Sequence, residues 1–201
     1  YHGKFLGTFG HLGCFSCYPT KNLGALGDSG VIVGNDAIAM ESVRIGREYG
    51  WKQRYVSETV GQNSRMDEIQ AAILRVKLKG LGSSIERRRE IANTYSEALS
   101  DIYRTPKVRQ NTAHAFHLYV LQVSDRSNLM AHLESDGIRC GIHYPVPVHK
   151  QPAYQRNVHT PFPLKVTEQL CKDVISLPLY PGLDDKDVSS VVDSLKRYAS
   201  H

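Results

Sequence analysis

Apolar residues recur at helical spacing through the middle of the chain. Ile69, Ala72, Ile73 and Val76 stand at i, i+3, i+4 and i+7, which predicts a helix over residues 65–79. A second long helix follows, and one of its faces carries Ile85, Ala92 and Leu99. The middle of the chain is therefore predicted to be a pair of consecutive amphipathic helices.

Both helices have a start signal in the sequence. Residues 64–67 (Ser-Arg-Met-Asp) form a capping-box pattern, and Ser83 with Glu86 repeats it. Gly80 and Gly82 separate the two helices.

Short apolar runs bounded by glycines characterise the first third of the chain. They predict strands over residues 14–18 and 31–34. Asn35 then offers an N-cap for a helix that carries Ile38 and Val43 on one face.

The pattern changes after about residue 100. Residues 117–123 and 139–144 are predicted strands, and residues 127–136 a helix that Gly137 closes. A strand, a helix, a second strand, a loop and a final helix make a small α+β unit.

The last amphipathic helix has Asp184 or Asp185 as its predicted cap. We place the domain boundary near residue 100, so that residues 1–100 and 101–201 form separate domains. A chain of 201 residues is long enough for one large domain or two small ones.

Charge and cysteine content narrow the class of protein. The net charge of +5 favours anionic ligands, but it falls short of the dense basic stripes of nucleic-acid binders. No apolar run approaches the roughly 18 residues of a membrane helix. Cys14 and Cys17 form a C-x-x-C pair without a second pair, so no metal site is expected. Reduced thiols in a cytoplasmic protein are the simpler interpretation.

Residues 16–24 concentrate groups that can hold an anion beside an amine. They read Ser-Cys-Tyr-Pro-Thr-Lys-Asn-Leu-Gly, with Lys21 in a turn after a predicted strand. Ser16 and Thr20 supply hydroxyls, and the glycines that follow allow close backbone approach. A lysine amine in such a place can form a Schiff base with an aldehyde. A cofactor that carries both an aldehyde and a phosphate would use both features, whereas a solvated surface lysine is the alternative.

Four motifs follow one another along the chain. They read GCFSCYPTKNLGALGDSG from residue 13, YGW and GQNSRMDEIQAA from residues 49 and 61, GIHYPVPVH and QPAY from residues 141 and 151, and LPLYP from residue 177. In this order they resemble the DegT/DnrJ/EryC1/StrS sugar aminotransferases, which are fold-type I enzymes dependent on pyridoxal 5′-phosphate (PLP). The resemblance implies an α/β fold, with the end of the fold-type I large domain followed by a small α+β C-terminal domain.

The resemblance also implies roles for individual residues. Lys21 would hold PLP as a Schiff base and act as the acid and base of the proton shift. Ser16 would bind the cofactor phosphate, and Asn63 would reach the phosphate of a neighbouring subunit in a homodimer. His143 and Tyr144 would lie near a nucleotide-sugar substrate. A lysine at position 21, where the dehydratases of the family have histidine, favours transamination.

The implied reaction moves an amino group from glutamate to a keto-deoxyhexose linked to dTDP or UDP. Such a reaction belongs to the biosynthesis of polysaccharide or antibiotic sugars, and amination at C3 or C4 stays open. The family's N-terminal half supplies an acidic residue for the pyridinium nitrogen, whereas no Asp or Glu precedes Asp28 here. We therefore expect this chain to be a fragment, weak or inactive by itself. The alternative is a non-catalytic remnant or domain of that fold that self-associates without PLP.

Overall fold

The computed structural model describes residues 1–200, and the chain divides into two compact units. Unit 1 comprises Tyr1–Ser84 with Arg109–Ala113, and unit 2 comprises Ile85–Val108 with residues 114–200. The division falls inside α3, the longest of the described helices, at Leu81–Leu99.

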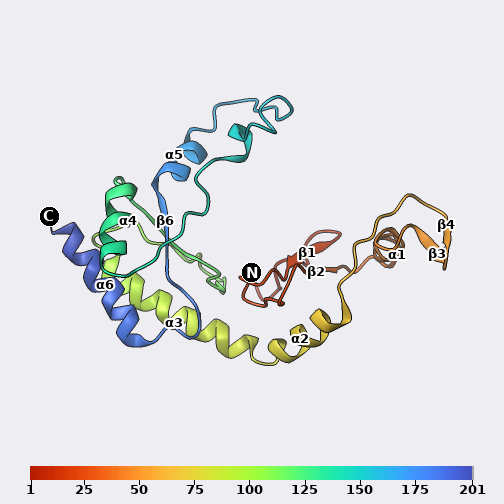
Figure 1. Cartoon of the computed structure of the whole chain (residues 1–201), viewed down its shortest axis with the longest axis horizontal. Coiled ribbons are helices and arrows are strands. Elements are labelled where there is room, and N and C mark those ends of the chain that lie inside the picture. Colours follow the sequence, from red (N-terminus) through yellow and green to blue (C-terminus); the bar gives the residue numbers. More distant parts are fainter. Residues whose placement is uncertain (201) are drawn as a thin grey trace. The chain divides into compact units, whose positions relative to one another are not determined.

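Unit 1 contains two small antiparallel sheets and two helices. Strands β1 and β2 pair in register from Gly13↔Val33 to Ser16↔Gly30, and β3 with β4 forms a short hairpin. The elements are β1 (Gly13–Ser16), β2 (Gly30–Val33), α1 (Ala37–Gly46), β3 (Trp51–Gln53), β4 (Val56–Ser57) and α2 (Glu68–Leu78), labelled in Figure 1. The buried apolar cluster of this unit is small and consists of Cys17, Ala25 and Leu74.

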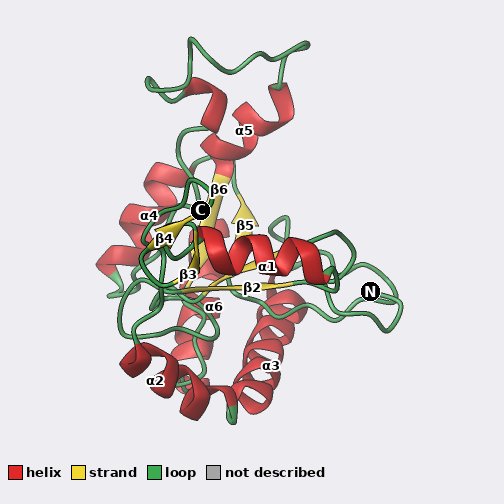
Figure 2. Ribbon diagram, turned by 90° about the vertical axis from the view of Figure 1, so that its right-hand side faces the viewer, coloured by secondary structure: helices red, strands yellow, loops and turns green. Residues whose placement is uncertain are grey.

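Unit 2 places helices around one two-stranded antiparallel sheet. The elements after α3 are β5 (Tyr119–Gln122), α4 (Arg126–Ser135), the 3-10 turn η1 (Val148–Lys150), α5 (Lys165–Asp173), β6 (Val174–Leu177) and α6 (Asp185–Ala199). Strands β5 and β6 pair with Tyr119 opposite Leu177 and Leu121 opposite Ile175. Figure 2 shows α4 and α6 beside these strands, and side chains from α3, α4 and α6 join those of the strands in one buried cluster.

The core of unit 2 pairs its polar groups as well as burying its apolar ones. Tyr119 and Leu121 are fully buried on one face of β5, as the period of two in a strand requires. The Tyr95 hydroxyl donates to the Pro178 carbonyl at 3.0 Å, and the Tyr119 hydroxyl lies 2.9 Å from that of Ser96. Each aromatic ring thus adds buried area without leaving an unpaired hydroxyl in the core.

A long connection leaves this core between α4 and α5 (Figures 1 and 2). Residues 152–163 are all exposed. His149 Nε2 lies 3.1 Å from Glu168 Oε1, and Lys150 Nζ lies 3.4 Å from the same oxygen. These two contacts attach the start of the connection to α5.

The helix starts differ from the predicted ones. Asp36, not Asn35, caps α1, because its carboxylate accepts the N–H groups of Ile38 and Ala39. Helix α2 begins at Glu68, three residues later than predicted, because Ser64 donates its N–H to the Arg47 carbonyl.

Helix α3 and the region after α4 also depart from prediction. Ser83 lies inside α3 and donates to the Gly80 carbonyl, so it is not a cap. The predicted strand over 139–144 is wrong, because only Gly141 pairs with the sheet, through a bridge to Ser176. The closing glycine Gly137 is confirmed, with φ +77°.

Candidate functional site

The Lys21 turn directly follows β1 and is held by main-chain hydrogen bonds. Ser16 ends β1, and its Oγ accepts the Tyr18 N–H at 3.3 Å. The Tyr18 carbonyl in turn accepts the Lys21 N–H at 2.8 Å. The Tyr18 backbone thus links the Ser16 hydroxyl to the main chain of Lys21.

Hydrogen bonds also close the base of this turn. The Cys17 carbonyl accepts the Ala25 N–H at 2.8 Å, and the Cys17 N–H donates to the Ser29 carbonyl at 2.8 Å. A Cβ at position 24 would lie 2.3 Å from the Pro19 carbonyl oxygen, so only glycine lets the chain pass there.

Helix α2 supports the same turn from its side chains. Gln70 Oε1 accepts the Leu26 N–H at 2.9 Å, and Lys77 donates to the Gly24 carbonyl. Leu74, between them on α2, packs with Cys17 and Ala25 in the buried cluster. The turn is therefore fixed by both the strand before it and the helix beside it.

The polar groups at this turn are suited to an anionic ligand. Lys21 is half-buried and forms no ion pair with any of residues 1–200. Ser29 Oγ is buried without a hydrogen-bond partner among the described residues. An amine without a carboxylate and a hydroxyl without a partner leave donors for a group that the chain itself does not supply.

Asn63 lies in a different part of unit 1. It bridges Glu48, and its Oδ1 accepts the Arg65 Nε–H at 3.0 Å. Arg65 also pairs with Glu48 at 3.4 Å. Within residues 1–200 these contacts do not connect Asn63 with the Lys21 turn.

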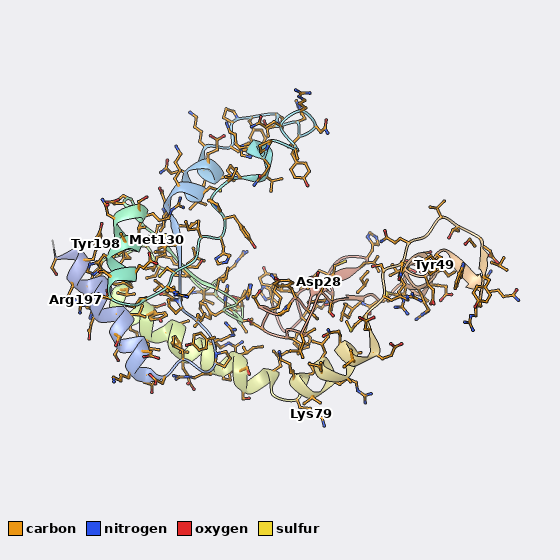
Figure 3. The ribbon with its side chains drawn as sticks, viewed as in Figure 1. Asp28, Tyr49, Lys79, Met130, Arg197 and Tyr198 are labelled. Carbon is orange, nitrogen blue, oxygen red and sulfur yellow. The ribbon has the colours of Figure 1, made fainter. Side chains whose placement is uncertain are left out.

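A cavity of about 580 Å³ lies at the β3–β4 hairpin, and two residues that line it, Glu48 and Arg65, contact Asn63. Its walls combine aromatic and charged side chains, namely Glu48, Tyr49, Trp51, Lys52, Arg54, Tyr55 and Arg65. Tyr49 lies at this end of unit 1 in Figure 3, with its ring 4.9 Å from that of Trp51. Three cations and one carboxylate give the cavity a positive balance.

The sequence around this cavity combines aromatic and basic residues. Between residues 49 and 55, Lys52 and Arg54 stand between Trp51 and Tyr55, and Tyr49 precedes them. The Trp51 and Tyr55 rings lie 5.2 Å apart, and the Arg54 guanidinium lies 4.8 Å from the Tyr55 ring centre. Aromatic rings close to cations can stack on a base and attract a phosphate.

His143 and Tyr144 belong to unit 2. His143 Nδ1 lies 2.8 Å from Ser176 Oγ, and the His143 and Tyr144 rings pack edge to face at 5.4 Å. Tyr144 is 68% exposed. Neither the Ser176 contact nor β6 itself was anticipated from the sequence.

Nowhere in residues 1–200 do three His, Cys, Asp or Glu side chains gather as a metal site would need. No helix in that part of the chain has the length and apolar character of a membrane span.

Solved structures that are similar to this chain include sugar aminotransferases. DesV from S. venezuelae, determined in complex with a ketimine intermediate, matches with a TM-score of 0.95 and 37% identity, over 100% of this chain and 55% of DesV. A DegT DnrJ EryC1 StrS aminotransferase from Brucella abortus matches with a TM-score of 0.96 and 34% identity, over 100% of this chain and 54% of that one. The predicted fold class is confirmed.

The model of the DegT/DnrJ/EryC1/StrS aminotransferase family matches residues 1–196, and the chain belongs to this family. One relative is the dTDP-3-amino-3,6-dideoxy-alpha-D-galactopyranose transaminase of Aneurinibacillus thermoaerophilus, which is 42% identical over 199 residues, 98% of this chain and 54% of that protein. The resemblance seen in the four motifs is confirmed. The chain spans about half the length of the curated relatives it matches.

Proposed function

We propose that the protein is a PLP-dependent aminotransferase that transfers an amino group from glutamate to a nucleotide-linked keto-sugar. The observation that carries the proposal is the Lys21 turn, in which a half-buried amine without a carboxylate partner follows Ser16 at the end of β1. Membership of the family supports the same reaction.

The donors at the turn fit a phosphate-bearing aldehyde. The Ser16 hydroxyl accepts the Tyr18 N–H and keeps its own hydrogen for a phosphate oxygen. Gly24 lets the chain close against Pro19 at the turn, and the Ser29 hydroxyl, unpaired among the described residues, adds a further donor. Bound PLP would supply an electron sink for the amino donor's Cα–H bond.

The chain's own residues then hold and move groups around that cofactor. Lys21 Nζ would bind the cofactor aldehyde at rest, and afterwards take and return the proton of the shift. His143 and Tyr144 would hold the nucleotide-sugar. Asn63 would donate to the phosphate held by a second copy, so a homodimer would be the working unit.

The cavity beside Asn63 supports the nucleotide part of the substrate. Trp51 and Tyr55 offer rings on which a base can stack, and Arg54 and Lys52 offer charge for a diphosphate. Amination at C3 or C4 stays open. The reaction would take place in the cytoplasm, where four free cysteines stay reduced.

Borohydride reduction followed by peptide mapping tests the cofactor role of Lys21. Reduction turns a lysine–PLP Schiff base into a stable amine, so we expect one phosphopyridoxyl group on Lys21 after incubation with PLP. Lys21→Ala should abolish the modification. Lys79→Ala, at the exposed end of α2, should leave it intact.

Two outcomes of this experiment would contradict the proposal. One is a chain that stays unmodified at excess PLP, and the other is a label spread over surface lysines at similar yield. Either result would favour the non-catalytic alternative.

Tryptophan fluorescence tests the nucleotide part separately, because Trp51 is the single tryptophan of the chain. We expect dTDP or UDP to quench it at saturation and pyrophosphate to compete. Arg54→Gln should weaken binding about tenfold, since it removes one charged hydrogen bond. Fluorescence that does not respond to either nucleotide would remove the cavity from the proposal.

A further inference from the structure

The Ser176 side chain does not take part in the apolar face of β6. Its neighbours Ile175 and Leu177 face the apolar cluster of unit 2. Successive side chains of a strand point to opposite faces, so the Ser176 hydroxyl points to the other face of the sheet. Ser176 is nevertheless only 3% exposed.

The residue that covers this hydroxyl is His143. Its Nδ1 lies 2.8 Å from Ser176 Oγ. Gly141 pairs with the Ser176 backbone in both directions, at 3.0 and 2.8 Å, and so fixes the chain two residues before the histidine. A Cβ at position 141 would lie 2.8 Å from His143 Cε1, so glycine leaves the space that the ring occupies.

The direction of the hydrogen bond follows from burial. A buried hydroxyl hydrogen needs an acceptor, because leaving it unpaired forfeits the hydrogen bond that it makes to water in the unfolded chain. Within residues 1–200 the group within hydrogen-bond distance of Ser176 Oγ is His143 Nδ1, which can accept in the neutral Nε2–H form of the ring. Pairing the buried hydroxyl hydrogen thus requires that the serine donates and that Nδ1 accepts with its lone pair.

We propose that Ser176 is a positioning residue that holds the His143 ring as its Nε2–H form and directs this N–H away from β6. The two nitrogens of an imidazole point in divergent directions, and the bond made by one sets the proton on the other. A fixed N–H donor suits an oxygen of a phosphate or a sugar hydroxyl.

The role of His143 toward substrate rests on the proposed function, and the assignment of the ring proton defines that role. His143 would donate to an oxygen of the nucleotide-sugar and would not act as an acceptor. Ser176 would touch no substrate and would act through the ring alone.

Nitrogen-15 NMR of the full 201-residue chain tests the assignment without any ligand. His143→Gln identifies the His143 signals among those of the nine histidines. At about pH 8.5, two units above the ordinary imidazole pKa, we expect Nε2 to carry the hydrogen in essentially all molecules. We also expect the spectra to show that His143 Hε1 lies close to the Gly141 α-hydrogens.

Two variants remove the restraint in different ways. Ser176→Ala deletes the donor and should give a mixture of the two neutral forms and weaken the contact with Gly141. Gly141→Ala keeps the hydroxyl but pushes the ring, and it should move the Nδ1 signal. Ser176→Thr retains the hydroxyl on a residue suited to strands and should restore the wild-type signals. Ser190→Ala, on the exposed side of α6, is the matched control and should change none of them.

The proposal fails if His143 is the Nδ1–H form in the wild type, or if Ser176→Ala leaves both the proton and the ring contact unchanged. Adding dTDP-glucose then tests the link to substrate, since it should shift the Nε2 signal in the wild type and less so in Ser176→Ala. An unchanged Nε2 signal would overturn that link. A missing PLP label on Lys21 would contradict the proposed function and leave the histidine assignment standing.

Discussion

Arg88 is a buried cation that pairs with carbonyls and, among residues 1–200, not with a carboxylate. One guanidinium nitrogen donates to the carbonyls of Phe116, His117 and Leu179, at 3.2, 3.3 and 2.8 Å. Burial lowers the pKa of the guanidinium, yet an arginine stays charged at any ordinary pH. The run Arg87-Arg88-Arg89 alone does not distinguish the three, but Arg88 lies three residues after Ile85 and four before Ala92, on the apolar face of the helix.

Replacing Arg88 by Met should destabilise unit 2. Buried carbonyls would lose their donor, which costs about 2–4 kcal/mol in the free energy of unfolding. Urea denaturation measures this change. Arg139→Met, at an exposed residue of the same unit, should stay within about 0.5 kcal/mol of wild type. Equal effects of the two variants would show that Arg88 is not needed for the fold.

Asp136 should make the stability depend on acid pH. The Ser194 hydroxyl, and after it Arg197 at 2.7 Å, donate to its carboxylate and lower the pKa of Asp136 (Figure 3 shows Arg197 beside α4). A lowered carboxyl pKa stabilises the fold above the ordinary Asp value of about 4, and this stabilisation is lost as pH falls from there toward the folded-state pKa. Asp136→Asn should flatten the dependence of the urea midpoint on pH below about 4.

Asp101→Asn is the control for that experiment, because Asp101 is exposed and forms no ion pair within residues 1–200. It should leave the acid dependence as in the wild type. If Asp136→Asn does the same, the hydrogen bonds of Asp136 do not contribute to stability.

At the scale of single elements, Asp184 decides where α6 begins. The sequence leaves Asp184 and Asp185 equal as caps, whereas in the structure Asp184 Oδ1 accepts the Asp187 N–H at 2.8 Å and Asp185 pairs with Arg87. Asp184→Ala should lower the free energy of unfolding by about 1 kcal/mol, and Asp184→Asn, which keeps the cap, by much less. Thermal unfolding of the two variants side by side distinguishes a cap from a mere surface charge.

Elements with a strong local signal could be predicted from the sequence. Helices α4 and α6 each have a capping residue and an apolar face that packs in the core, and β5 is an apolar run. The strand over 139–144 was predicted wrongly, because an apolar run does not say whether a pairing partner is free. Strand β6 supplies four paired residues to β5, and only Ser176 also pairs with Gly141.

Only part of the candidate site could be predicted from the sequence motifs. Lys21 and Ser16 come from one local segment, so their proximity could be predicted. The contact of His143 with Ser176 joins residues 33 positions apart, and it depends on tertiary structure that no local pattern encodes.

At the scale of the whole molecule, the two units differ in how much apolar surface they bury. The cluster of unit 2 draws on three helices and both strands, whereas that of unit 1 contains three buried residues. Large side chains of unit 1 stay exposed, among them Phe5 at 85% and Leu6 at 70%. Local stability follows buried apolar contacts, so the units should open at different free energies.

Hydrogen exchange should therefore divide the chain within α3. We expect slow exchange for the amides of β5, β6 and α6, and faster exchange for those of β1, β2 and α1, with Leu81–Ser84 faster than Ile91–Leu99. Uniform protection would mean that the exposed residues of unit 1 are covered in solution, and size-exclusion chromatography would then show self-association.

The exposed connection over residues 152–163 is a place where the polypeptide can be divided. Residues on both sides of it complete one core, with Tyr95, Tyr119 and Leu129 before it and Ile175 and Leu195 after it. A break in this segment would not interrupt the buried core, because its residues are exposed and exposed segments tolerate a cut. Two polypeptides divided after Arg156 and produced together should reassemble as a split protein, with β6 of the second inserted beside β5 of the first.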